Sequence, residues 1–389
     1  MRPDSVISKK YSSMQRDASI SIAKAVAIIL MVIGHTEYPG LLTSCLYTFH
    51  MPLFFITAGY FFSRRTASDP WNFCRKRFRG LYLPMVKWSL LWLLLHNVFH
   101  HFGVLNEAFG NWEGGVTHPY TLQETVRRLV QIFTSMSGYD EFMAGAFWFF
   151  RGLLVASLVF LVLFRLVDSA PGKKEEWHVA ALICLGAVAF TAAHIYFRFK
   201  ISTIPAGGWR ETWGLFFFGI GVIYRRWEPF IGKRWPVALC CLLLICFAGS
   251  QHWSGMNNIG RYRDLWSLPL TGIAGFLMVH YASKVIAARE GWLKRLLVFI
   301  GDNTLYILVF HIISFKAVSL LKISYYGLDW RQIGCHMVIH DHQGDWFWIL
   351  YSVAGVVLPL LGLVAARRLR DYLRRSILEA RSPEDLAQE

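Results

Sequence analysis

The sequence predicts an all-α, polytopic membrane helix bundle of about ten transmembrane helices. Of its 389 residues, 55% are hydrophobic and only 17% are charged, which is too apolar for a soluble domain of this length. Several stretches of roughly 17–25 residues carry few charges and are long enough to cross about 30 Å of hydrocarbon. Lysine and arginine gather between these stretches, so the net charge of +15 is typical of cytoplasmic loops and does not indicate a nucleic-acid partner.

The apolar stretches define the expected organisation of the chain. We expect spans at residues 19–36, 42–63, 80–101, 144–166, 178–197, 209–224, 236–250, 264–287, 297–320 and 346–366. With the N-terminus inside, most of the 40 lysines and arginines fall in cytoplasmic segments, which predicts that both termini are cytoplasmic. We therefore expect one multi-pass domain, 19–366, in the inner or plasma membrane of the cell, between an N-terminal segment, 1–18, and a basic tail, 367–389. Since residues 1–18 are polar, we expect no cleavable signal peptide.

The first span carries two polar residues on one face. Lys24 and His35 are eleven residues apart, which at ~100° per residue is three turns plus about 20°, and ~16 Å along the axis. Inside a membrane such groups are candidates for function. His35 could take a proton from a hydroxyl, or it could be an interfacial packing residue; Glu37, in the turn that follows, could orient it. Lys24 could face an anionic ligand, or it could snorkel to the inner headgroups.

The inner loop 64–79 is dense in positive charge. Arg75, Arg77 and Arg79 precede Pro84 of the third span. Such a cluster could hold the phosphates of a ligand. The same residues also serve as a positive-inside signal and could contact anionic lipid, so both interpretations remain open.

The fourth span opens with aromatic residues and then an arginine. Trp148 lies in the segment 147–150, and Arg151 follows about 10 Å below the outer surface by helical rise. An arginine at this depth needs a cavity or a partner. It could polarise a carbonyl group or hold a polar ligand. Alternatively, it could pair with an acid such as Glu211.

The ninth span brings a further histidine into the outer half of the bundle. His311 lies about nine residues beyond Asp302 and Asn303, either of which could cap the helix. A lone histidine in a helix bundle is often a hydrogen-bonded packing residue, and this applies to His50 as well. The seven cysteines form no CxxC pair, so we expect buried hydrophobic cysteines and no metal site.

The order of these motifs resembles the acyltransferase-3 family of integral-membrane O-acyltransferases, in particular its sugar O-acetyltransferase branch. The family's basic residue, ten intervening residues and histidine correspond here to Lys24 and His35. The motif FHMPLFF at 49–55, the aromatic and glycine-containing segment 213–221 and the segment 301–311 continue the similarity, which covers about residues 16–366. Lysine stands where the family often has arginine, so a bidentate guanidinium is missing at that position. We expect the segment 213–221 to pack through its small residues.

The resemblance implies a membrane O-acyltransferase that moves an acetyl group from acetyl-CoA to a hydroxyl of a cell-envelope or exported carbohydrate. The candidate site residues are His35, Arg151 and His311 for catalysis, Lys24, Arg75, Arg77 and Arg79 for the donor, and Glu37, His50 and Trp148 for orientation or the acceptor. The partners are an acyl-CoA co-substrate, the carbohydrate and the lipid bilayer, with no tightly bound cofactor. The oligomeric state is left open.

Two other classes of protein remain open at this point. A transporter or flippase of a polar glycan or lipid-linked intermediate would also carry intramembrane charges. Its usual repeats and paired broken helices are not evident in the sequence. A non-catalytic membrane partner would leave Lys24 and His35 dispensable. Dependence on acyl-CoA separates these classes.

Overall fold

A computed structural model describes residues 17–36, 40–110, 118–172, 174–199, 201, 205–256 and 261–380. These residues form helices joined by turns, with no β-strand among them, which confirms the predicted all-α class. The longer helices are α2 (Ala18–Gly34), α4 (His50–Tyr60), α7 (Leu83–His101), α9 (Leu122–Ser135), α11 (Trp148–Ser169), α12 (Glu176–Phe197), α13 (Trp209–Ile231), α14 (Trp235–Ser250), α15 (Asp264–Ala287), α16 (Trp292–Asp302), α17 (Thr304–Tyr326) and α18 (Phe347–Ala380). The shorter ones are α3 (Gly40–Tyr47), α5 (Arg64–Ser68), α6 (Pro70–Arg77), α8 (Glu107–Gly110), α10 (Glu141–Ala144), the π-helical turn η1 (Phe78–Tyr82), and the 3₁₀ turns η3 (Gly145–Phe147), η4 (Pro205–Gly208) and η5 (Trp330–Gly334).

Six helical stretches in the described chain are long and apolar enough to cross a membrane: Gly40–Tyr60, Glu141–Ser169, Glu176–Phe197, Asp264–Ala287, Thr304–Tyr326 and Phe347–Arg374. Two shorter apolar helices are Ala18–Gly34 and Trp235–Ser250. The chain is therefore a multi-pass helical protein. The number of about ten spans and the cytoplasmic location of both termini stay predictions.

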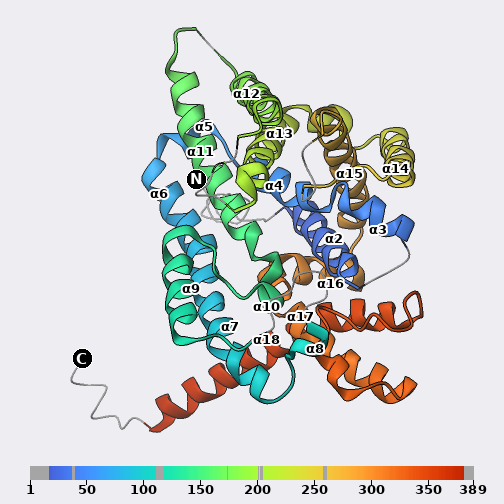
Figure 1. Cartoon of the computed structure of the whole chain (residues 1–389). Helices are drawn as coiled ribbons and strands as arrows, with labels where there is room; N and C mark the ends of the chain where they lie inside the picture. Colours follow the sequence, from blue (N-terminus) through green and yellow to red (C-terminus); the bar gives the residue numbers. More distant parts are fainter. Residues whose placement is uncertain are drawn as a thin grey trace, which may run out of the picture.

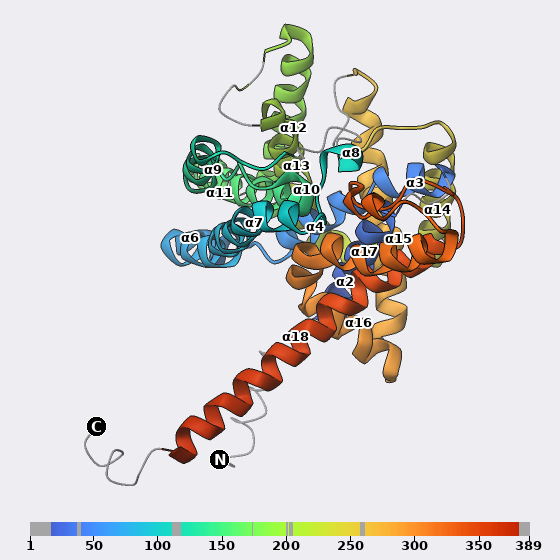
Figure 2. The ribbon, with the colours of Figure 1, turned by 60° about the horizontal axis from the view of Figure 1, so that its bottom comes forward.

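Helix α2 lies inside the bundle and contacts α4, α15, α16, α17 and α18 (Figures 1 and 2). Asp17 caps its N-terminus by accepting a hydrogen bond from the Ser19 backbone N–H at 2.9 Å. The Ser19 hydroxyl also lies 3.0 Å from His280 Nε2 on α15. The Ser21 hydroxyl donates to Asp302 of α16 at 2.9 Å. These bonds place the start of α2 beside α15 and the junction of α16 with α17.

Two of the expected spans are interrupted. The second is split into α3 and α4, and the ninth is split into α16 and α17 at Asn303. Asn303 occupies the N-cap position of α17, one of the two predicted, but its side chain makes no cap bond. The Asn303 amide instead donates to Phe299 O, and its oxygen accepts a hydrogen bond from Arg367 of α18. Asp302 accepts the bond from Ser21.

Helices α4 and α13 cross in direct backbone contact. A Cβ atom added to Gly59 would lie 1.9 Å from Phe218 O, and one added to Gly221 would lie 2.1 Å from Ile56 O. Only glycine permits this approach, so the expected packing of segment 213–221 through small residues is confirmed. At the C-terminal end of α4, Phe62 packs edge-on against Phe73 of α6, with ring centroids 5.6 Å apart.

The last helix leaves the bundle. Helix α18 is packed against α17 and α2 along its first half, and its second half extends away from the other helices (Figure 2). It runs without a break from Phe347 to Ala380. The basic segment after residue 366 is therefore helical as far as it is described.

Candidate functional site

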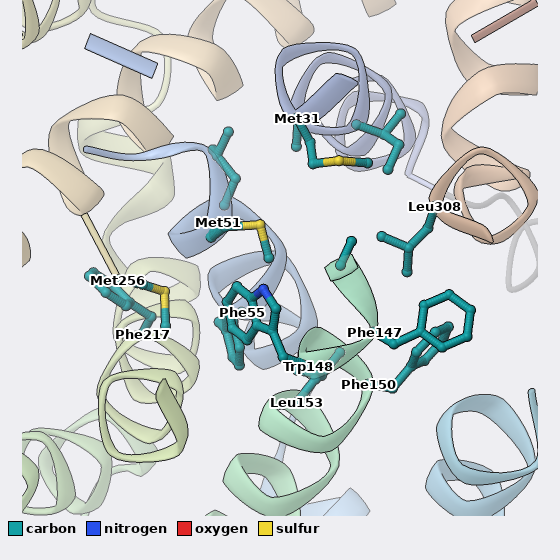
Figure 3. Packing of buried hydrophobic residues seen from close by; sticks show 14 of the residues in the cluster. Met31, Met51, Phe55, Phe147, Trp148, Phe150, Leu153, Phe217, Met256 and Leu308 are labelled. Atoms are coloured by element: carbon teal, nitrogen blue, oxygen red, sulfur yellow. The ribbon is translucent and has the colours of Figure 1, made fainter. Parts of the chain in front are cut away.

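A cavity of about 760 Å³ lies between α2, α4, α11 and α17. Its walls are largely apolar, and Figure 3 shows Met31, Met51, Trp148 and Leu308 from these four helices lying around a common space. The polar groups in its lining include four imidazoles, at His35, His50, His336 and His340. An apolar cavity with a few polar groups is typical of a small-molecule site.

The cavity reaches toward both ends of the bundle. His35 follows the last residue of α2, and His50 is the first residue of α4. The lining also contains Gly80 of η1 and Thr304, the first residue of α17. The Ser21–Asp302 bond places Thr304 near the start of α2, opposite His35. Phe73 of α6 packs against Phe62, just beyond the end of α4 that lies opposite His50. Since η1 directly follows α6, η1 also lies toward that end of the bundle.

His35 and His311 form a hydrogen-bonded pair. His35 Nδ1 lies 3.0 Å from His311 Nε2, and the two rings stack with centroids 5.2 Å apart. His35 is half-buried and lines the cavity, whereas His311 is fully buried behind it. Sequence reasoning treated the two as separate candidates, because their segments are far apart along the chain.

Hydrogen bonds determine the tautomers of this pair. His311 Nδ1 lies 3.0 Å from Ile307 O and 3.1 Å from Leu308 O. A carbonyl oxygen can only accept, so His311 Nδ1 carries the proton and Nε2 is the acceptor. His35 Nδ1–H therefore donates to His311, which leaves the lone pair on His35 Nε2. A base of this kind can take a proton from a hydroxyl in the cavity.

His50 and Trp148 also line the cavity. His50 Nδ1 donates to Leu46 O at 2.7 Å, so its other nitrogen is an acceptor. The Trp148 ring lies under the guanidinium of Arg210, whose carbon is 4.5 Å from the ring centroid. Both residues can orient a ligand next to His35.

Arg151 forms the ion pair with Glu211 that the sequence offered as the alternative to catalysis. Arg151 Nε lies 2.8 Å from Glu211 Oε1, and both residues are buried. Arg151 is absent from the described lining of the cavity. The pair joins α11 to α13.

The predicted donor-binding residues lie toward the other end of the bundle. On α2 the cavity lining begins at Ile28, one turn after half-buried Lys24 on the same helix face. Arg75 and Arg79 are exposed, and Arg79 directly precedes Gly80 of the lining. Arg77 instead turns inward, with its guanidinium carbon 5.0 Å from the Phe73 ring centroid and 5.6 Å from that of Phe218. Glu37 lies outside the described residues.

The loop of residues 327–346, which the predicted topology assigns to the outer side and which we call the outer loop, covers the His35 end of the cavity and contributes His336 and His340 to its lining. Two buried lysines of α17 anchor this loop. Lys316 Nζ donates to Ile333 O at 2.7 Å and to Cys335 O at 2.6 Å. Lys322 Nζ donates to Ile339 O at 3.3 Å and pairs with Asp345 at 3.3 Å.

Sequence reasoning did not assign His336, His340 or Arg210 to the site. The sequence could have indicated a structural role for Lys316 and Lys322, since a lysine inside an apolar span needs a partner. Pairing these lysines with a particular loop requires the three-dimensional structure.

Comparison with known proteins gives one match. A family model described as an acyltransferase domain matches residues 17–368. Among curated proteins and among solved structures, nothing matches the chain.

Proposed function

Because this chain belongs to the acyltransferase-3 family, and so is a multi-pass membrane acyltransferase, we propose that it moves an acetyl group from acetyl-CoA to a hydroxyl of a cell-envelope or exported carbohydrate. The observation that carries the proposal is the placement of His35 in the cavity. Its Nδ1–H is bonded to His311, and its Nε2 is the free base.

The chemistry is that of a general base. His35 Nε2 takes the proton of the acceptor hydroxyl as the hydroxyl oxygen attacks the thioester carbonyl carbon. The carbon–oxygen bond forms, the carbon–sulfur bond breaks, and the proton passes to the CoA thiolate that leaves. His311 stabilises the protonated His35 ring by accepting its Nδ1–H.

The two ends of the cavity support separate approaches for the two substrates. The donor approaches from the end where Gly80 lines the cavity, next to the exposed Arg79, and its phosphates contact the cluster of Arg75 and Arg79. Lys24 adds positive charge one turn below the cavity. The acceptor approaches from the side of His35, His50 and Trp148, which we place on the outer side of the inner or plasma membrane.

The test is transfer of labelled acetyl from acetyl-CoA in membranes of the native host, where the acceptor is present. Membranes with the wild-type protein are expected to label a glycan fraction. His35→Ala should lower the transfer rate by about 10²–10⁴-fold, the usual contribution of a general base. His101→Ala, at an exposed histidine outside the cavity, is the matched control and should retain full transfer.

Each outcome is decisive when the variant protein is shown by detergent gel filtration to be folded. Full transfer by folded His35→Ala removes His35 from the chemistry. Label that appears only in lipid contradicts the carbohydrate acceptor. Absence of label with the wild type contradicts acetyl-CoA as the donor, and binding of a panel of other acyl-CoAs then follows.

A further inference from the structure

Arg210 is a cationic group in the cavity wall to which the proposed reaction assigns no role. It is the second residue of α13, and its side chain lines the cavity at the same end as His50 and Trp148. Within the described part of the chain its guanidinium makes no hydrogen bond or ion pair, and its Nε is buried without a partner. A desolvated donor of this kind is costly unless a ligand satisfies it.

The nearby acids do not neutralise this charge. Glu211 is already bonded to Arg151 Nε at 2.8 Å, and that pair is buried behind the cavity wall. Glu141 is the other nearby acid, and it is exposed and forms no ion pair with Arg210. Within the described part of the chain, Arg210 therefore has no directly bonded counter-ion.

Stacking on Trp148 holds the guanidinium in a defined plane. The guanidinium carbon is 4.5 Å from the centroid of the Trp148 ring. A stacked arginine keeps its N–H edge free, and that edge matches the two oxygens of a carboxylate or phosphate. An aromatic ring beside such a cation also offers apolar surface to the face of a sugar.

The position of Arg210 favours the acceptor over the donor. The phosphates of a CoA donor are expected at Arg75 and Arg79, toward the end of the bundle that contains Gly80. Arg210 lies at the opposite end, with His50 and Trp148. An anion bound by Arg210 therefore belongs to the second substrate.

We propose that Arg210, held on Trp148, binds an anionic group of the acceptor, so that the substrate is an acidic glycan bearing a carboxylate or a phosphate. The inference rests on the proposed acetyl transfer to carbohydrate. It makes Arg210 a specificity-determining residue, with no part in bond breaking.

The test compares three preparations of the acceptor fraction from the native host: untreated, carboxyl-reduced with carbodiimide and borohydride, and dephosphorylated with hydrofluoric acid. With the wild-type protein, one of the two treatments should raise the KM for acceptor about tenfold or more, the scale of a charged hydrogen bond. The treatment that does so identifies the anion. The KM for acetyl-CoA should not change.

Variants assign the effect to Arg210. Arg210→Gln should raise the acceptor KM to a similar degree with little change in kcat, and neither treatment should raise it further. Arg210→Lys keeps the charge and should recover part of the affinity. Lys87→Gln is the matched control, since Lys87 also stacks on a tryptophan, Trp88 at 4.4 Å, but is exposed and does not line the cavity.

Several outcomes overturn the inference. A wild-type KM unaffected by either treatment, or an Arg210→Gln protein that binds the untreated acceptor normally, contradicts it. A fall in kcat without a change in KM would instead place Arg210 at the transition state. If Arg210→Gln does not fold, the inference is still tested by the acceptor KM of the wild type with the treated acceptors and by that of Arg210→Lys. Absence of any transfer by the wild type removes the proposed function and this inference together, whereas transfer to a neutral glycan removes this inference alone.

Discussion

His311 controls which nitrogen of His35 is basic, although it does not itself line the cavity. Its own Nδ1 is bonded to two carbonyl oxygens of α17, so the only atom it offers to His35 is an acceptor. A histidine without this partner would divide its population between two tautomers and turn more freely. We therefore describe His311 as a positioning residue.

His311→Ala is expected to lower kcat by roughly 10²-fold, because the basic tautomer of His35 loses its support. The KM values for both substrates should change little. His311→Gln keeps an oxygen that can accept from His35 Nδ1–H, and it should recover part of kcat with an unaltered pH profile. Steady-state kinetics across pH 6–9 make the comparison. Equal losses in the two variants would indicate a structural role only.

Lys24 lies one turn below the cavity lining, where an ammonium can contribute to donor binding. Lys24→Arg retains the charge and should keep near-normal transfer. Lys24→Ala should raise the KM for acetyl-CoA about tenfold, the scale of one charged hydrogen bond, while the acceptor KM is unchanged. An unchanged donor KM in Lys24→Ala would remove Lys24 from the site.

Among the elements, the π-helical turn η1 is distinctive because it lines the cavity with Gly80. A Cβ atom added to Gly80 would meet nothing within 4 Å, so a side chain there would occupy open space. π-helical turns are rare and are often found at functional sites. This turn connects the arginine-rich helix α6 to α7.

Gly80→Leu is expected to leave the fold intact and to narrow the donor end of the cavity. The KM for acetyl-CoA should rise several-fold, while His35 and the acceptor end are unaffected. Gly186→Leu is the matched control, since Gly186 is an exposed helical glycine on α12 that also has nothing within 4 Å and does not line the cavity. Donor kinetics that are equal in the two variants would contradict a donor path past Gly80.

At the scale of the whole molecule, His336 in the outer loop makes the stability of the folded protein depend on pH. Burial, together with the nearby Lys316 ammonium, lowers the pKa of His336 to about 4, against the opposing effect of Asp140. In the unfolded chain a histidine takes up a proton near pH 6.5. The stabilising contribution of neutral His336 is therefore complete above about pH 6.5 and is lost as the pH falls toward 4.

His336→Gln should consequently show a smaller drop in melting temperature between pH 7 and pH 4.5 than the wild type. Thermal unfolding of the detergent-solubilised protein measures this difference. His101→Gln, at an exposed histidine outside the loop, should behave as the wild type does. Identical pH dependence in His336→Gln and the wild type would contradict the buried state of His336.

Local periodicity explains which parts of the molecule could be predicted. The helical repeat that places Lys24 and His35 on one face is a property of a single segment, and the structure continues that face through Ile28 and Met31 in the cavity wall. The close packing of α13 through its glycines could be predicted for the same reason. Helix boundaries were less accurate, because the breaks before His50 and at Asn303 depend on contacts with other helices.

Contacts between distant segments could not be predicted. His35 and His311 meet only because α2 and α17 pack together, and Arg210 reaches the cavity through the start of α13. Arg151 illustrates the same limit: its partner Glu211 was named as one alternative, but the distance between them follows from packing alone. Without an internal repeat, the sequence carries no rule for such pairings.

The lysine anchors of the outer loop have an evolutionary consequence. Lys316 and Lys322 hold the loop largely through main-chain oxygens at positions 333, 335 and 339. Every amino acid supplies that oxygen, so the hydrogen bonds of the two lysines do not depend on which side chains stand at these three positions. The side chains at 336 and 340, which line the cavity, can then vary while these main-chain anchors stay in place. A loop anchored in this way can change the wall of the cavity without losing its attachment to α17.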